Sequence, residues 1–393
     1  MNTLRERFPV LFAAALLWLA CQGLAFFGGM PAFVVQMAND WHYTASQQGL
    51  MAMAEVVGNA LGSLLLAHVI HGRTARFTIG CGLLMQLVGN AAMCGDPTFW
   101  PACGERVVAG VGGGIVFGTA IRYLSLDPRA DTLLPLMVFC QYIGMTVLTS
   151  VVVPALGSIG ASLEMCTTMA GLSLLVLFFF ADGGKVAGEV SDGELPAVHA
   201  GGAWLVLASI FLVSATAGVA WTFLESVGLA SGIAAAQVHK AIGASAVPTI
   251  VVCLCMPMLL RRGWTVSSGV VLLGVCAAGA LLLATPLTPW TFFAAATAFT
   301  GGWMASGVSQ YAMLPDFDPV GRHIALIPAC VGIGSAVGSL VGGTLIDASA
   351  GFSLAYEIAT VFALLAIATL VIASRLGAKP RRGDAVSLQS SMR

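Results

Sequence analysis

The sequence predicts an all-α membrane protein in which twelve transmembrane helices form two six-helix bundles. Of the 393 residues, 58% are hydrophobic and only 9% are charged, whereas soluble domains carry roughly 25% charged residues. Apolar stretches of about 20 residues recur along the chain, and each is long enough to cross a hydrocarbon core of roughly 30 Å. A transmembrane β-barrel would need short segments that alternate apolar and polar residues, and the sequence lacks them.

A polar segment near the middle of the chain separates the apolar stretches into two groups of six. It contains Lys185, Glu189, Asp192 and Glu194 among glycines and other small residues, and such a composition buries too little apolar surface to fold. We therefore expect an N-terminal bundle over residues 1–181, a cytoplasmic linker over 182–202, a C-terminal bundle over 203–374 and a cytoplasmic tail over 375–393.

Each apolar stretch is predicted to form one transmembrane helix. In the first half the predicted spans are 9–35, 48–70, 76–94, 99–121, 133–157 and 163–181. In the second half they are 203–229, 239–260, 265–285, 290–313, 325–346 and 353–374. The first span follows Arg5 and Arg7, but its apolar part is too long for a signal peptide and no small-x-small cleavage site closes it.

The positions of the basic residues predict the orientation. If the N-terminus is cytoplasmic, all 17 Lys and Arg residues except Arg106 and Lys240 fall in inner loops and tails, as expected because basic residues stay on the cytoplasmic side. Both termini are therefore expected in the cytoplasm, which agrees with an even number of spans. The expected location is the plasma membrane, namely the inner membrane of a bacterium.

The two halves resemble each other in sequence. Residues 48–72 align with residues 237–261, and both segments end in short basic loops. Tyr123 aligns with Tyr311, and Gln36 aligns with Glu225. Parallel repeats of six helices, related by an axis along the membrane normal, are an architecture of membrane transport proteins.

Ionisable side chains inside the apolar stretches are the first candidates for a functional site, because a charge at the bilayer centre costs at least about 2.5–3.5 kcal/mol on insertion. Glu55 and Arg106 lie at similar depths in the second and fourth spans, so we expect an ion pair between them. Glu225, late in the seventh span, is a candidate for binding a proton or a solute; alternatively it is an interfacial acid that ends a helix. Glu105 and His239 lie nearer an interface.

Aromatic and amide residues gather in the first, seventh and tenth spans. Apolar walls with a few polar groups suit an amphipathic organic solute. Each of these residues alone is also explained by helix packing or by an aromatic side chain at the membrane interface. The candidates for lining a solute cavity are Gln22, Phe26, Gln36, Trp221, Phe223, Trp303, Gln310 and Tyr311.

Glycines at a spacing of four residues allow helix backbones to approach closely. The second span contains Gly58 and Gly62, and the eleventh contains Gly334, Gly338 and Gly342. Two interpretations are open. These glycines form surfaces on which the two halves move against each other, or they serve static packing between helices.

Several classes of function find no support in the sequence. The ten cysteines have no metal-binding spacing and are expected to be small core residues. No Walker loop, HExxH or GxSxG motif occurs, so we expect no enzyme activity, catalytic residue, metal or cofactor. A net charge of −1 gives no support to a nucleic-acid partner.

The fourth span carries the most specific motif. Its run GERVVAGVGGGIVFG places Arg106 ahead of Gly110, Gly112, Gly113 and Gly114, and it resembles the fourth-helix motif of the major facilitator superfamily. With the twelve spans and the six-plus-six repeat, the resemblance covers nearly the whole chain. It implies that the first, fourth, seventh and tenth helices line a central cavity. It also associates the arginine at position 106 with proton coupling.

The resemblance implies a secondary active transporter that moves a small organic solute by alternating access and is coupled to protons. The expected partners are therefore the solute and protons. Glu55, Arg106 and Glu225 are the charged candidates, and the expected state is a monomer in the lipid bilayer. Uncoupled facilitated diffusion is the alternative within this class. A membrane sensor on a transporter scaffold is a further alternative, although sensors normally have a soluble output region and the tails here are short.

Overall fold

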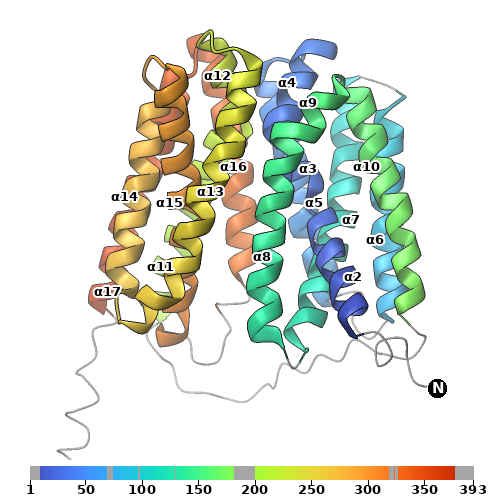
Figure 1. Cartoon of the computed structure of the whole chain (residues 1–393), viewed down its shortest axis with the longest axis horizontal. Helices are drawn as coiled ribbons and strands as arrows, with labels where there is room; N and C mark the ends of the chain where they lie inside the picture. The colour runs from blue at the N-terminus through green and yellow to red at the C-terminus, as the bar shows by residue number, and fades with distance from the viewer. Residues whose placement is uncertain are drawn as a thin grey trace, which may run out of the picture.

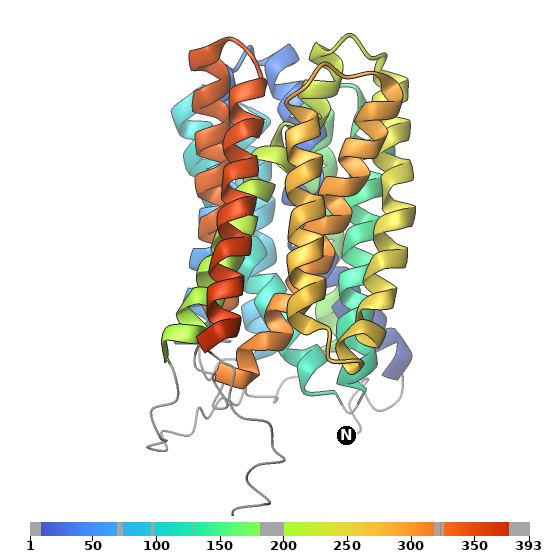
Figure 2. The same cartoon turned by 90° about the vertical axis from the view of Figure 1, so that its left-hand side faces the viewer.

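The computed structural model is a bundle of long helices that run side by side (Figures 1 and 2). The structure describes residues 9–68, 74–95, 98–127, 129–180, 200–317, 323 and 326–376. Within these ranges it contains helices and no strands, and nine of the helices are long and apolar enough to cross a membrane. The prediction of an all-helical, multi-pass membrane protein is therefore confirmed. Most of the predicted linker and tail lies outside the described residues.

The first half of the chain forms six helical stretches, some of which are interrupted. The first stretch consists of α2 (Pro9–Gln22), α3 (Ala25–Gly28) and α4 (Met30–Asp40). Three continuous helices follow: α5 (Ala45–His68), α6 (Ala75–Met93) and α7 (Phe99–Ser125). The last two stretches are α8 (Ala130–Val147), η1 (Leu148–Val152) and α9 (Val153–Leu156), and then α10 (Ile159–Ser173) and η2 (Leu174–Phe179).

The interruption after α8 has a local cause. Pro154 has no backbone N–H, so the helix loses one intrahelical hydrogen bond there, and the wider π-helical turn η1 lies directly before it. Gly157 then adopts a positive φ of 74° and ends α9, a conformation that glycine adopts without steric penalty. Ser158 caps the next helix by accepting a hydrogen bond from the backbone N–H of Ala161.

The second half also forms six helical stretches. They are α11 (Ala200–Thr222) with α12 (Leu224–Ala230), α13 (Ala235–Arg261), α14 (Thr265–Leu283), α15 (Pro289–Phe317), α16 (Ile327–Ser349) and α17 (Ser353–Leu376). Each predicted span overlaps one of these helical stretches, although only nine helices in the described ranges are long and apolar enough to cross a membrane. The stretch α2–α4 is not among the nine membrane-length helices because it is interrupted, and α6 and α15 are excluded by their more polar composition.

The glycines of the fourth-helix motif place α7 at the centre of the first half. A side chain at Gly110 or Gly114 would collide with the backbone of α5. Gly112 lies equally close to the backbone of α6, and Gly113 lies against the carbonyl of Gly23, just after α2. The spacing of the glycines therefore lets three helices approach one helix at backbone distance.

The glycines at a spacing of four serve packing within each half. Gly58 and Gly62 of α5 contact the backbone of α7, which belongs to the same half. Gly334 and Gly338 of α16 contact the backbone of α11, and Gly342 contacts side chains of that helix and of the residue after it. The interpretation that these glycines form moving surfaces between the halves is therefore wrong, and the static interpretation is correct.

The two halves meet mainly through α5 and α16, with further contacts between α4 and α12 and between α8–η1 and α13. We call the end of the molecule that carries α4, α9 and α12 the upper end, as in Figure 1. Phe26, Phe33 and Met37 of the first half share one apolar cluster with Trp221 and Phe223 of the second half.

Towards the lower end the first half has an apolar cluster of its own. Its members include Phe12, Leu16, Val116 and Phe180, and all of its described residues come from the first half. The arginines at the ends of helices lie at this lower end: Arg76, Arg122, Arg129, Arg261, Arg262 and Arg375. Apart from Arg106 and Lys240, which were also the exceptions in the sequence, the described basic residues thus lie at one end of the bundle.

Candidate functional site

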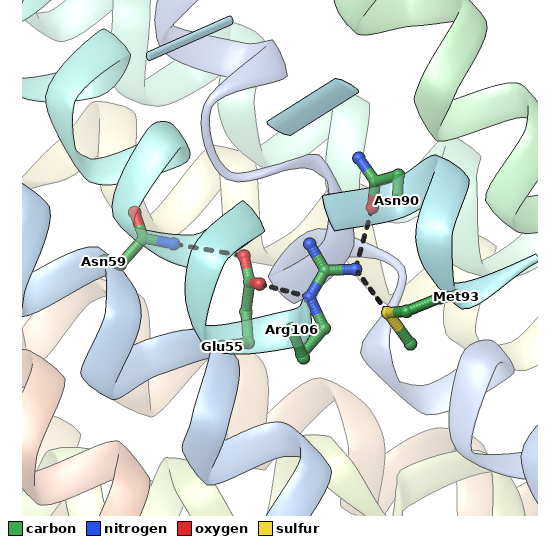
Figure 3. A network of polar contacts seen from close by, with 5 residues as sticks. All are labelled: Glu55, Asn59, Asn90, Met93 and Arg106. Atoms are coloured by element: carbon green, nitrogen blue, oxygen red, sulfur yellow. Dashed lines mark hydrogen bonds and ion pairs between the residues drawn. The ribbon is translucent and has the colours of Figure 1, made fainter. Parts of the chain in front are cut away.

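Arg106 and Glu55 form a buried ion pair in the first half (Figure 3). Arg106 Nε lies 2.7 Å from Glu55 Oε2, and each side chain is only 1% exposed. The predicted contact between the two residues is therefore present.

Two amides and a sulfur complete the surroundings of the ion pair. Asn59 Nδ2 donates to Glu55 Oε1 at 3.1 Å, from one turn further along α5. Arg106 Nη1 donates to Asn90 Oδ1 at 2.9 Å and lies 3.8 Å from the sulfur of Met93, both on α6. The network therefore connects α5, α6 and α7, and it compensates charges that would otherwise be costly at this depth.

Phe26 covers the guanidinium of Arg106. The Cζ atom of Arg106 lies 3.9 Å from the centroid of the Phe26 ring, within range for a cation–π interaction. Phe26 in turn stacks on Phe33, with 4.4 Å between ring centroids and an angle of 10° between the rings. The short segment α3, between the two interruptions of the first stretch, thus holds an aromatic lid over the ion pair.

A small cavity adjoins the ion pair. Its walls include Gln22, Phe26, Gln86, Asn90, Arg106 and Cys166. These residues come from α2, α3, α6, α7 and α10, which all belong to the first half. Gln22 and Phe26 thus line a cavity, but this cavity lies inside one half and not between the two halves.

Glu225 lies in a second polar contact, near the upper end. Its Oε1 atom is 2.8 Å from Nε2 of His239, and the two side chains are 5% and 19% exposed. Glu225 lies in the first turn of α12 and His239 lies in α13. Gln36, the counterpart of Glu225 in the sequence repeat, lies in α4, which is also a short helix that follows an interruption. Helix α4 contacts α12, the helix of Glu225.

Two of the predicted cavity residues, Gln36 and Gln310, make hydrogen bonds within one half, and a third, Phe223, is buried. Gln36 Nε2 donates to the carbonyl of Val153 at 2.9 Å, and its Oε1 accepts from Ser162 at 2.7 Å. Gln310 Nε2 donates to Ser209 Oγ at 2.8 Å. Phe223, in the interruption between α11 and α12, is fully buried.

The other three lie elsewhere on α11 and α15. Trp221 Nε1 donates to the carbonyl of Phe27 at 3.1 Å and so joins the two halves. Trp303 lies 6.2 Å from the Trp221 ring and stacks on Phe299 at 5.7 Å, measured between centroids. Tyr311 is 43% exposed and lies away from these aromatic contacts, two turns further along α15.

A buried hydroxyl cluster joins the halves at α8, and sequence reasoning missed it. The phenol of Tyr142 lies beside the hydroxyls of Ser245, Thr249 and Thr300, and Thr249 Oγ1 is 3.1 Å from Thr300 Oγ1. Tyr142 belongs to the first half and the other three to the second. Hydroxyl residues in apolar helices commonly bond their own backbone, so the sequence alone gave no signal for this cluster.

A second contact between the halves lies at the upper end and was also missed. The carboxylate of Asp347, near the end of α16, accepts hydrogen bonds from the backbone N–H groups of Ala45 and Ser46 at 3.0 and 2.8 Å. These two amides open helix α5 of the first half. Among the described residues, no group of three or more His, Cys, Asp or Glu side chains could hold a metal ion.

The whole chain is similar to solved structures of the nucleoside transporter NupG. A variant of that protein aligns with a TM-score of 0.72 and 12% identity, over 93% of this chain and 99% of that chain. A second NupG structure aligns with a TM-score of 0.69 and 14% identity, over 94% and 100%. No family model and no curated protein sequence matches. At this identity the likeness shows the fold, which is that of a major facilitator transporter, as the fourth-helix motif indicated.

Proposed function

We propose that this chain is a secondary active transporter that moves a small organic solute across the plasma membrane by alternating access, coupled to protons. The transporter fold over the whole chain and the absence of a recognised catalytic motif in the sequence support this proposal. We propose further that the chain crosses the membrane twelve times and that both termini lie in the cytoplasm. The arginines gathered at the lower end support this orientation.

The observation that carries the proposal is the way in which the two halves meet. At the upper end they share an apolar cluster, and Asp347, Trp221 and Tyr142 make polar contacts across the boundary. Nearer the lower end, the apolar cluster around Phe12 and Val116 belongs to the first half alone. Contacts of this kind at the upper end are what one of the two states of alternating access requires, and the proposal assigns the structure to that state.

This proposal assigns residues 1–181 and 203–374 to two bundles that move as units. Residues 182–202 form the cytoplasmic linker, and residues 375–393 form a cytoplasmic tail. The proposal places the joined upper end on the outer side of the membrane and the lower end on the cytoplasmic side. The opposite state requires the contacts of Asp347 and Trp221 to break.

Proton coupling draws on two buried acids. Glu55 and Glu225 are both buried, and each lies against a basic side chain, Arg106 and His239 respectively. A buried carboxylate whose partner moves away becomes easier to protonate, since burial favours the neutral form and a nearby cation favours the charged form. A change in the spacing of either pair between states would therefore bind or release a proton.

The experiment that tests the proposal is a flux assay in proteoliposomes with an imposed pH gradient. Nucleosides are the first solutes to test because the similar structures are of a nucleoside transporter, followed by organic acids, amines and hydrophobic drugs. Uptake that follows the gradient supports proton-coupled transport, and uptake that ignores it indicates facilitated diffusion. Folded protein that moves none of these solutes would contradict the transport proposal.

A further inference from the structure

The cavity beside Arg106 has unused hydrogen-bonding capacity in its walls. Gln22 and Gln86 are 3% and 5% exposed. The side-chain oxygens of both accept no hydrogen bond from any residue in the described ranges. A buried amide oxygen left without a partner costs about 1–3 kcal/mol, so two such oxygens beside one cavity point to a ligand.

Packing fixes Gln86 in this position. Gly112 and Gly113 of α7 lie against the backbone and side chain of Gln86, and the Gln86 side-chain nitrogen faces Gly113. The amide therefore has little freedom to turn towards another partner. The same glycines that bring α6 and α2 close to α7 also direct Gln86 towards the cavity.

The walls restrict the chemistry of the ligand. The cavity has room for about one water molecule, which excludes an organic solute. The guanidinium of Arg106 forms part of the wall and disfavours a metal cation, while the two amide oxygens disfavour an anion. A small neutral molecule that donates hydrogen bonds remains.

Water fits these requirements. It donates two hydrogen bonds, one for each amide oxygen, and it accepts one from a guanidinium N–H. It also suits either assignment of the amide oxygen and nitrogen atoms, which are interchangeable in shape, because it both donates and accepts.

We propose that the cavity between α2, α6, α7 and α10 is a binding site for one water molecule, held by Gln22, Gln86 and Arg106. This site lies inside the first half and is separate from any solute site between the halves. It makes the ion pair of Arg106 and Glu55 part of a hydrated network although both side chains are 1% exposed. The inference does not depend on the transport proposal.

Cys166 provides the test, since its thiol lies in the wall of the cavity. A short X-ray pulse splits water into hydroxyl radicals, which oxidise the side chains that touch the water. The full-length protein in lipid nanodiscs is irradiated in water enriched in heavy oxygen, and oxidation at each cysteine is measured by mass spectrometry. Cys276 is the matched control because it is 0% exposed and lies in α14, away from the cavity.

The expected result is oxidation at Cys166 several-fold above that at Cys276. Two variants separate bound water from leakage of bulk solvent. Gln86→Leu removes one acceptor, and Ala25→Val fills space in the cavity wall; both are expected to reduce oxidation at Cys166 towards the level of Cys276. Thermal unfolding of each variant reports whether it is folded.

Three results would overturn the proposal. The first is equal oxidation of Cys166 and Cys276 in the unmodified protein, which needs no variant. The second is oxidation at Cys166 that persists unchanged in folded Gln86→Leu and Ala25→Val proteins. The third is a melting temperature that rises in sodium chloride relative to choline chloride and loses this dependence in Gln86→Leu, because that pattern would identify a bound cation.

Discussion

Asp347 caps a helix that belongs to the other half of the molecule, with its Oδ2 atom 2.8 Å from the backbone nitrogen of Ser46. Its Oδ1 atom lies 3.0 Å from the nitrogen of Ala45. In the same turn, the side chains of Thr44 and Gln47 each accept a hydrogen bond from the backbone N–H of the other residue. They therefore do not compete with Asp347 for the amides of Ala45 and Ser46. In the proposed transport cycle the halves separate at the upper end, where both amides would bond to water instead, so Asp347 would favour the joined state.

Replacing Asp347 with Ala is expected to loosen the start of α5. Loss of a side-chain cap costs about 1 kcal/mol, which corresponds to roughly five-fold faster amide exchange when the exchange rate is proportional to the opening equilibrium constant. Hydrogen exchange of the peptide that contains Ala45 and Ser46 measures this change. Asp40→Ala is the matched control, because Asp40 caps α10 at Ile159 within the first half and its loss should affect α10 alone. Unchanged exchange at Ala45 and Ser46 in Asp347→Ala would refute the capping role.

The ion pair of Glu55 and Arg106 is expected to behave as a coupled unit. Breaking a buried pair by removing one partner costs about 3–5 kcal/mol, because the remaining charge is left uncompensated. Glu55→Gln and Arg106→Gln should each lower the melting temperature strongly, whereas the double variant should be more stable than either single variant. A double-mutant cycle of thermal unfolding in detergent measures the coupling. Additive effects would show that the two charges do not depend on each other.

The sequence predicted this ion pair because charged side chains are rare in apolar helices, and two opposite charges at similar depth have few other partners. The fold was predictable for a similar reason, since length, hydropathy and the glycines after Arg106 are local features. The interruptions at Leu24 and Gly29 were not predictable, because the apolar character of the stretch continues through them. Proline offers a signal at Pro154, but it does not specify the π-helical turn before it.

Contacts between the halves could not be predicted from the sequence, for a different reason. Asp347 and Ala45 lie 302 residues apart, and nothing in either segment indicates how the two bundles are placed. The same holds for the Tyr142 cluster, where four inconspicuous hydroxyls become significant only when α8 meets α13 and α15. Gln86 and Asn90 were passed over because amides in helices are common, and their importance depends on the position of Arg106.

Glu225→Gln is expected to uncouple solute movement from the pH gradient. The amide keeps the shape of the carboxyl group and a hydrogen-bonding atom near His239, but it cannot take up a proton. Accumulation driven by the gradient should fall to the level without a gradient, while counterflow between equal solute pools should continue. Both are measured in the same proteoliposomes.

Glu357→Gln is the matched control for this variant, because Glu357 is an exposed acid in α17. It should leave both gradient-driven accumulation and counterflow unchanged. Glu225→Gln protein that still accumulates solute like the unmodified protein would remove Glu225 from the coupling mechanism. Loss of both activities would instead assign Glu225 to solute binding.

Two glycines of α7 allow the close packing of α7 against α5 to be tested, because they lie on the same helix but have different neighbours. A Cβ atom at Gly114 would collide with the backbone of Asn59, which cannot move without shifting α5, so Gly114→Ala is expected to destabilise the protein by about 1–3 kcal/mol. At Gly104 a Cβ atom would meet nothing within 4 Å, and Gly104→Ala should be neutral or stabilise by up to about 1 kcal/mol through higher helix propensity. Thermal unfolding of the two variants measures the difference. Equal melting temperatures would mean that α5 and α7 are less closely packed than the motif requires, because only backbone contact distinguishes the two positions.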